Sequence, residues 1–355
     1  MFAKSKNTDK LYKCMLISIS IYILSIYLAI ITGTSSYTYT YEGIGYKGWF
    51  ESGNSLSAIF TLSMFIILNI FSKKVDSKMK KHTAVIIGLV GIFLVFLIGT
   101  RVGLLGFAIA MLMWGIARVI YNIINKRKIR QILIASGIIS AMAIATFVIV
   151  FMAIGSETLE RRKKVQEMAN KLVDETTNEK IHITGDLYEI KKQIENGTLE
   201  DGYMSPKQQQ TVLTLNEIAK KQNLSTENMR TLQLIYNTEL AKNQANPIYL
   251  LFGNGYVSQY REMILEMELF AILINFGLLG FILYLMPFIA IYGYSLYKGI
   301  RYIKKVDMEY LMLVAGGGLA FALSVLSGYI FFNASTTMII ILTNVLLVNK
   351  AKELK

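Results

Sequence analysis

Cysteine, histidine and proline are scarce in this chain of 355 residues, which contains one, two and three of them respectively. The single cysteine, Cys14, excludes an intramolecular disulfide and a thiolate metal cluster. The two histidines, His82 and His182, lie far apart and do not have metal-ligand spacing. The chain also lacks a Gly-Lys-Ser/Thr phosphate loop and a nucleophile elbow. The sequence therefore gives no support for ATP-driven transport or zinc-dependent hydrolysis, and we expect no metal and no cofactor.

Charge is sparse as well: charged residues make up 17% of the chain, whereas apolar residues make up 54% and the mean hydropathy is +0.45. The apolar residues form eight runs that are long enough, or nearly long enough, to cross a bilayer as helices. Strands facing lipid would instead alternate over about ten residues. We therefore predict an all-α, polytopic transmembrane helix bundle, with spans at residues 12–32, 55–71, 84–100, 102–123, 132–155, 270–297, 309–329 and 331–349. The first run lacks a small-residue cleavage site, which indicates a retained span.

Lysine and arginine are concentrated in every second gap between these runs. They gather in the amino-terminal tail, in residues 72–81, 118–130 and 298–305, and in the carboxyl tail. Because positively charged loops next to spans stay in the cytoplasm, the pattern predicts a multi-pass membrane protein with both termini cytoplasmic. The formal net charge of +13 then reflects topology and indicates no nucleic-acid partner.

The same pattern places one long polar segment, residues 156–265, outside the cytoplasm, between spans 5 and 6. We therefore divide the chain into spans 1–5 (residues 1–155), this loop, and spans 6–8 (residues 266–355). The loop is rich in Lys, Glu, Gln, Asn and Thr, and helix formers favour helices at 157–171, 188–195, 216–221 and 228–241. A helical cap is the preferred interpretation, and a mobile loop that orders on substrate is the alternative.

Arg101 lies in the sequence Gly99-Thr100-Arg101-Val102-Gly103, a tight break between two apolar runs on the predicted outer side. A guanidinium at the membrane boundary is costly unless it reaches the interface or meets an anion. One interpretation is a topological anchor in a short hairpin. The other is a fixed donor to a phosphate, with Gly99 and Gly103 allowing a ligand to approach the backbone.

Two carboxylates, Glu266 and Glu268, stand where the long loop enters the sixth apolar run. Their spacing of two residues points them roughly 200° apart on a helix, so they do not share one face. For Glu266, a role as a base or cation ligand and a solvated helix end are both open. The carboxylate that faces no cavity is interpreted as a helix amino-terminal charge favoured by the macrodipole.

Three further groups complete the candidates. Trp49 and Asn54 precede the second span, where an aromatic residue is most often part of the interfacial belt and where Asn54 is placed to cap the helix. Gly253 and Gly255 form a Gly-Asn-Gly turn at the end of the loop. Arg230 lies in an amphipathic stretch shortly before that turn and stands out among loop arginines, which are usually solvated.

Three segments, in order, resemble the bacterial O-antigen polymerase and O-antigen ligase superfamily of membrane glycosyltransferases. The first is Lys47-Gly48-Trp49-Phe50 with Asn54 downstream, and the second is Thr100-Arg101-Val102-Gly103-Leu104-Leu105. The third runs from the Gly253-Asn254-Gly255 turn through Glu266-Met267-Glu268 to Gly277-Leu278-Leu279-Gly280. Each segment alone is weakly specific, but their order and common side of the membrane make the set moderately specific.

The resemblance implies transfer of glycan units at the outer face from an undecaprenyl-diphosphate-linked donor, by polymerisation or by ligation to an acceptor. For this reaction, our hypothesis is that Arg101 and Arg230 stabilise the leaving diphosphate and that Glu266 is the base for the acceptor hydroxyl. Trp49, Asn54, Gly103, Gly253, Gly255 and Glu268 are expected to bind substrate. Membrane lipids and other polysaccharide-assembly membrane proteins are the expected partners.

The chain departs from the family pattern in two ways. The ligase branch has a His-Asn pair where this chain has Glu266 and Met267, which favours the Glu-rich Gram-positive relatives. Family members usually have ten or more spans, and a short variant, a truncated reading frame and an inactive remnant are all open as explanations. Two other classes of function are alternatives: a transporter or flippase for lipid-linked glycans, and a noncatalytic membrane partner. The spans carry almost no ionisable residue near mid-depth, which argues against ion-coupled transport.

Overall fold

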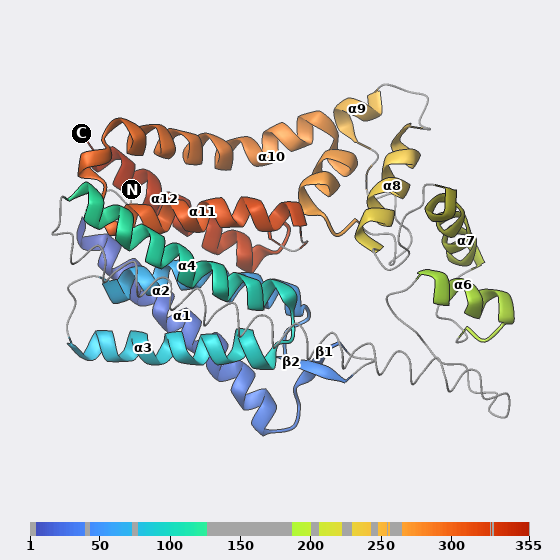
Figure 1. Ribbon diagram of the computed structural model, residues 1–355, viewed down its shortest axis with the longest axis horizontal. Coiled ribbons are helices and arrows are strands. Elements are labelled where there is room, and N and C mark those ends of the chain that lie inside the picture. The colour runs from blue at the N-terminus through green and yellow to red at the C-terminus, as the bar shows by residue number, and fades with distance from the viewer. Residues whose placement is uncertain are drawn as a thin grey trace. The chain divides into compact units, whose positions relative to one another are not determined.

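The computed structural model describes residues 5–39, 43–72, 77–125, 187–199, 206–221, 229–242, 248–253, 255, 265–326, 328 and 330–354 (Figure 1). Helices dominate, and the chain divides into two compact units. The first unit combines Met1–Gly155 with Leu285–Lys355, and the second is Ser156–Tyr284. The prediction of a helical protein is confirmed. The described residues also include a small two-stranded hairpin that the sequence analysis did not predict.

Six helices within the described residues are long and apolar enough to cross a membrane, so the chain is a multi-pass membrane protein. The six candidate spans are Lys10–Ile31, Gly53–Ser72, Val102–Ile124, Glu268–Arg301, Met308–Val325 and Ala334–Glu353. The predicted span at 84–100 is instead a shorter apolar helix, Lys81–Ile92, followed by a π-helical turn. The predicted span at 132–155 lies outside the described residues. The described part of the chain thus contains six candidate spans, and the predicted number of eight stays a prediction.

The helices of the first unit are bounded as follows: α1 (Ser5–Ile31), α2 (Gly53–Ser72), α3 (Ser77–Ile92), the π-helix η1 (Phe93–Leu97), α4 (Arg101–Ile124), the 3₁₀ turn η3 (Ile303–Lys305), α11 (Met308–Leu326) and α12 (Ala334–Glu353). The part of α10 (Glu268–Arg301) that follows Tyr284 also belongs here. The central helix is α2, which packs against α1, α3, α4, α11 and α12 and is buried along most of its length. Its apolar side chains, such as Phe60 and Phe65, therefore form the core of this unit.

A two-stranded antiparallel sheet connects α1 to α2. Strands β1 (Ser36–Tyr39) and β2 (Ile44–Gly48) pair with Tyr37 opposite Tyr46, and the two rings lie 5.5 Å apart. Gly45 adopts a φ of 71°, and a side chain there would overlap the carbonyl oxygen of Ile98. The hairpin therefore lies directly against the break that precedes α4.

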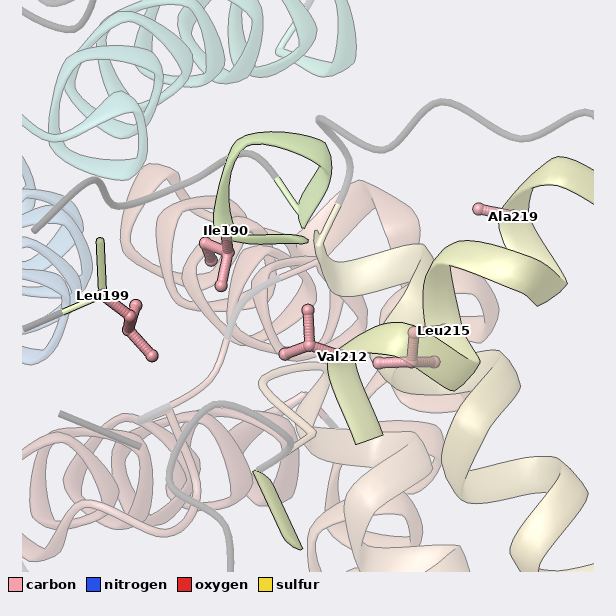
Figure 2. Packing of buried hydrophobic residues seen from close by; sticks show 5 residues of the cluster. All are labelled: Ile190, Leu199, Val212, Leu215 and Ala219. Atoms are coloured by element: carbon pink, nitrogen blue, oxygen red, sulfur yellow. The ribbon is translucent and has the colours of Figure 1, made fainter. Parts of the chain in front are cut away.

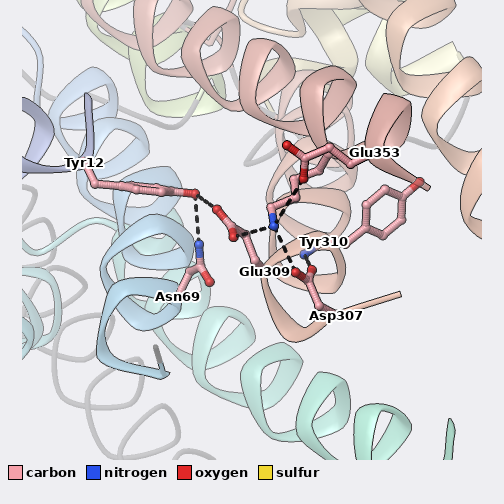
Figure 3. Close-up of polar contacts among 7 residues, drawn as sticks. Tyr12, Asn69, Asp307, Glu309, Tyr310 and Glu353 are labelled. Carbon is pink, nitrogen blue, oxygen red and sulfur yellow. Dashed lines mark hydrogen bonds and ion pairs between the residues drawn. The ribbon is translucent and has the colours of Figure 1, made fainter. Parts of the chain in front are cut away.

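A buried polar cluster ties together one end of α1, α2, α11 and α12 (Figure 3). Tyr12 donates a hydrogen bond to Glu309 and accepts one from Asn69 at 3.1 Å. The ammonium group of Lys350 lies 3.0 Å from carboxylate oxygens of both Asp307 and Glu309. The beginning of α1 and the end of α12 thus lie at the same end of the first unit, where Figure 1 also shows both chain termini.

The second unit contains α6 (Leu187–Asn196), α7 (Pro206–Lys221), α8 (Met229–Lys242), α9 (Ile248–Phe252) and the first part of α10. Its core is formed by Ile190, Leu199, Val212, Leu215 and Ala219 (Figure 2). The helices predicted at 188–195 and 228–241 correspond closely to α6 and α8, and the one predicted at 216–221 is the end of the longer α7. The predicted helix at 157–171 lies outside the described residues.

Helix α10 is interrupted at Gly277, where φ is 66° and ψ is −172°. The interruption lies where the chain closely approaches Gly253, and a side chain on either glycine would overlap backbone atoms of the other segment. The amide of Gly255 also donates a hydrogen bond to the carbonyl of Asn275 at 2.9 Å. The predicted continuous span at 270–297 is therefore two helical pieces that meet at this contact.

Candidate functional site

Arg101 is the first residue of α4 and follows a sharp break in the chain. The π-helix η1 ends at Leu97, Gly99 adopts a positive φ of 69°, and Thr100 is extended. Thr100 is the amino-terminal cap of α4, because its hydroxyl oxygen accepts a hydrogen bond from the amide of Gly103 at 3.1 Å. The backbone of Arg101 is thus held between a glycine turn and a capped helix start.

The cap is anchored to the neighbouring helix α2. The hydroxyl oxygens of Ser57 and Thr100 lie 2.5 Å apart, and both residues are buried. A side chain on Gly103 would come within 3.0 Å of the Ser57 hydroxyl and 3.2 Å of the Thr100 hydroxyl. Gly103 therefore allows α4 to begin in contact with α2. The close packing of these helices is sufficient to explain why a glycine stands at this position. Its predicted contact with substrate stays a prediction.

Helix α12 begins at the same end of the first unit as α2 and α4. Asn333 caps α12 by accepting from the amide of Thr336 at 3.1 Å, and its side-chain amide donates to the hydroxyl of Ser55 at 3.3 Å. Ser55 and Ser57 are two residues apart on α2, which directs them to different neighbouring helices. The first turns of α2 therefore contact the starts of two other helices, and the positive ends of three helix dipoles share one region.

Trp49 and Asn54 also lie near this end of the first unit. The Trp49 side chain is exposed, and its indole nitrogen donates to the hydroxyl of Thr34 at 2.9 Å. Asn54 is the second residue of α2, so it does not cap the helix as predicted. Ser52 has that role, because its hydroxyl accepts from the amide of Ser55 at 3.3 Å. Substrate binding by Trp49 and Asn54 stays a prediction.

In the second unit, two residues predicted separately are in contact. The Nε atom of Arg230, on α8, donates to Oε2 of Glu266 at 3.0 Å. Both side chains are about two-fifths exposed, with relative accessibilities of 39% and 42%. An ion pair this accessible contributes little to stability, because solvent screens it. Its significance is the presence of a guanidinium and a carboxylate at one accessible place.

Glu266 and Glu268 occupy different environments, although not for the reason predicted, because Glu266 precedes α10 and the two residues do not share a helix. The amide of Glu266 donates to the side-chain oxygen of Gln233, one turn along α8 from Arg230, at 3.4 Å. Glu268 is almost fully buried, with 1% exposure, and is the first residue of α10. It therefore occupies the position that the helix dipole favours for a negative charge. Of the two carboxylates, Glu266 is the accessible one.

Gly253 and Gly255 form the contact with the break in α10. A side chain on Gly253 would overlap the backbone of Asn275 and Gly277, whereas one on Gly255 would meet nothing within 4 Å. Backbone packing thus accounts for Gly253, and a positive φ of 67° accounts for Gly255. Their predicted contacts with substrate stay predictions.

Four polar residues that the sequence analysis did not single out support these positions: Ser55, Ser57, Asn333 and Gln233. Asn333 carries a sequence signal, because an asparagine directly before an apolar run is a typical helix cap. The two serines and the glutamine have no such signal, since their partners are distant in the sequence. Among the residues that the structure describes, no group of three His, Cys, Asp or Glu side chains could hold a metal ion.

Comparison with known proteins gives one assignment. The family model described as "O-antigen ligase like membrane protein" matches residues 2–353, nearly the whole chain. No curated protein and no solved structure matches the chain significantly. The chain therefore belongs to the O-antigen ligase-like family of membrane proteins, which indicates a membrane glycan ligase or polymerase.

Proposed function

We propose that this protein is a membrane glycosyltransferase of surface-polysaccharide synthesis. It acts at the extracytoplasmic face of the bacterial cell membrane and takes its glycan from an undecaprenyl-diphosphate-linked donor. The observation that carries the proposal is the pairing of Arg230 with Glu266, because it brings an anion-binding group and a candidate base together in a member of a glycan-transferring family. The glycan is either joined to a growing polymer or moved to a separate acceptor.

The proposed chemistry has one bond made and one broken. Glu266 takes the proton of the acceptor hydroxyl, whose oxygen then attacks the anomeric carbon of the donor sugar. The bond between that carbon and the diphosphate oxygen breaks, and the lipid diphosphate leaves with the electron pair. Because a diphosphate is a good leaving group, stabilising its charge matters more than protonating it. We assign this stabilisation to Arg101 and Arg230.

The geometry of Glu266 suits a base. Its Oε2 atom is fixed by Arg230, while Oε1 has no hydrogen-bond partner within the described part of the chain. The side chain is also accessible enough to reach an acceptor. A carboxylate fixed through one oxygen keeps its orientation and retains a second oxygen for a proton. Glu268, which is buried, lacks this accessibility.

Two features support the proposed outer location. The Tyr12, Glu309 and Lys350 cluster holds the beginning of α1 and the end of α12 at one end of the first unit, which agrees with two cytoplasmic termini. The break at Arg101 belongs to the opposite end, because α2 and α12 begin there. If the termini are cytoplasmic, the start of α4 at Arg101 then lies on the outer side.

The test is an assay of the purified protein in detergent with a lipid-diphosphate-linked oligosaccharide and no ATP. The proposal predicts that glycan chains become longer and that one lipid diphosphate is released for each glycosidic bond formed. Transfer to a supplied acceptor without chain growth would identify a ligase. Movement of the intact donor across vesicles, without any new glycosidic bond, would instead support a flippase. No reaction in either format, with correctly folded protein, would support a noncatalytic partner.

A further inference from the structure

We infer that Ser57 is a positioning residue for Arg101: it fixes the start of α4 by a hydrogen bond to Thr100. This inference rests on the proposed function, in which Arg101 stabilises the leaving diphosphate. Ser57 itself is buried, with 0% exposure, and so is not placed to touch a substrate. Its effect on the reaction would be exerted through the helix start alone.

The hydrogen bonds around Thr100 carry the inference. Thr100 is 2% exposed, and its hydroxyl oxygen accepts from the amide of Gly103 while lying 2.5 Å from the Ser57 hydroxyl. A threonine hydroxyl that only caps a helix is free to leave the cap by rotating about χ1. The second bond, to a different helix, holds it in the capping rotamer. The first turn of α4, which begins with Arg101, is therefore fixed to α2.

The position of Arg101 depends on this contact because Arg101 directly follows the break between η1 and α4. Residues Ile98 and Gly99 form a turn, in which the Ile98 amide donates back to Phe93 and Gly99 has a positive φ. Helix α2, in contrast, is buried along most of its length and packs against five other helices. The Ser57 hydroxyl thus fixes the start of α4, where the residue proposed to bind diphosphate lies, to the well-buried helix α2.

Thr61 provides a matched control on the same interface. It lies one turn beyond Ser57 on α2, is equally buried, and contacts α4 at Gly106. Its hydroxyl has no hydrogen-bond partner among the described residues. Thr61→Val keeps the shape of the side chain and removes only this hydroxyl. Ser57→Ala also removes one buried hydroxyl from the α2 and α4 interface, but it alone removes the bond to the cap.

The experiment measures chain extension and the binding of undecaprenyl diphosphate by the purified full-length protein in detergent. Ser57→Ala is expected to lower kcat/KM for the donor by about 10-fold to 100-fold, as small displacements of a catalytic group do. Thr61→Val should stay within about twofold of the wild type. Thr100→Ser, which keeps the capping hydroxyl, should also retain activity, whereas Thr100→Val should lose as much as Ser57→Ala.

A double-mutant cycle with Arg101→Ala separates positioning from general destabilisation. If Ser57 acts through Arg101, Ser57→Ala weakens diphosphate binding in the wild-type background and has no further effect in the Arg101→Ala background. Equal losses in both backgrounds, or equal activities of Ser57→Ala and Thr61→Val, would overturn the inference. Wild-type diphosphate binding and chain extension by Arg101→Ala would overturn the proposed function as well. A loss with Arg101→Ala but none with Ser57→Ala would overturn this inference alone.

Discussion

Arg230 donates a hydrogen bond from Nε to Oε2 of Glu266 at 3.0 Å, across 36 positions of sequence. The contact joins α8, within the predicted outer loop, to the segment that leads into α10. The sequence analysis selected the two residues separately and did not predict that they touch, because they are far apart in the sequence. Within the second unit it defines an accessible place where one guanidinium and one carboxylate are held together.

Replacing Arg230 with lysine tests the geometry of this pair. Lysine keeps the positive charge but loses the planar guanidinium that contacts Glu266 through Nε and is suited to a phosphate. We expect Arg230→Lys to lose nearly as much chain extension as Arg230→Ala, at least about 10-fold. The control is Lys191→Arg, which alters an exposed ion pair with Glu195 in α6 and should leave the rate unchanged. Full activity of Arg230→Lys would mean that only charge is needed.

The two carboxylates are distinguished by amide substitutions. Glu266→Gln removes the proposed base, so chain extension should fall by about 10²-fold to 10⁴-fold. Glu268→Gln should have the smaller effect on rate, because Glu268 is buried in the first turn of α10 and is not placed to reach an acceptor. Initial rates of glycan extension, normalised to folded protein, measure both. The reverse order would identify Glu268 as the functional carboxylate.

The polar cluster of Tyr12, Glu309 and Lys350 lies at the end of the first unit that holds both termini. Disrupting it should lower stability and leave activity unaffected. Lys350→Met leaves Glu309, whose side chain is only 7% exposed, without its cationic partner. Breaking a fully buried pair costs about 3–5 kcal/mol, and the cost here should be smaller because Lys350 itself is partly exposed. Thermal unfolding in detergent should show a clearly lower midpoint. Lys352→Met, two residues later and exposed, should leave the midpoint unchanged.

The contact between Gly253 and Gly277 predicts unequal effects of two alanine substitutions. Gly253→Ala and Gly255→Ala each place a side chain at a positive φ, which costs about 1–2 kcal/mol. Only Gly253→Ala also overlaps the backbone of α10, so it should lower the unfolding midpoint further. Protease resistance of the segment around α9 measures the same difference locally. Equal destabilisation by both substitutions would mean that the contact with Gly277 is not needed.

Much of the fold follows from apolar run length, because a span needs a continuous stretch of about 20 apolar residues. That requirement identified α2, α4, α11 and α12 within a few residues. It also identified the candidate span Glu268–Arg301, but it did not reveal the break at Gly277, where the chain meets Gly253, which is distant in the sequence. It failed at residues 84–100, where an apolar run is divided between α3 and η1.

The candidate site was predictable where a residue is unusual in its own surroundings. Arg101 stands between two apolar runs and Glu266 at the start of another, and each is detectable without knowledge of the fold. Ser57 and Gln233 were not detectable, because a serine within a span or a glutamine within a loop is ordinary. Their significance arises only when the helices pack and bring them to Thr100 and to Glu266.

Glycan polymer made by cells that carry Arg101→Ala is the most direct measure of the proposed mechanism. The account predicts that polymer is lost, by at least about 10²-fold, while the protein inserts in the membrane at its normal level. Arg101→Lys should fail as well, because bidentate contact with the diphosphate is lost. Arg118→Ala, at the other end of α4 and over the Trp114 ring, is the control and should leave polymer unchanged. Wild-type amounts of polymer with Arg101→Ala would contradict the account.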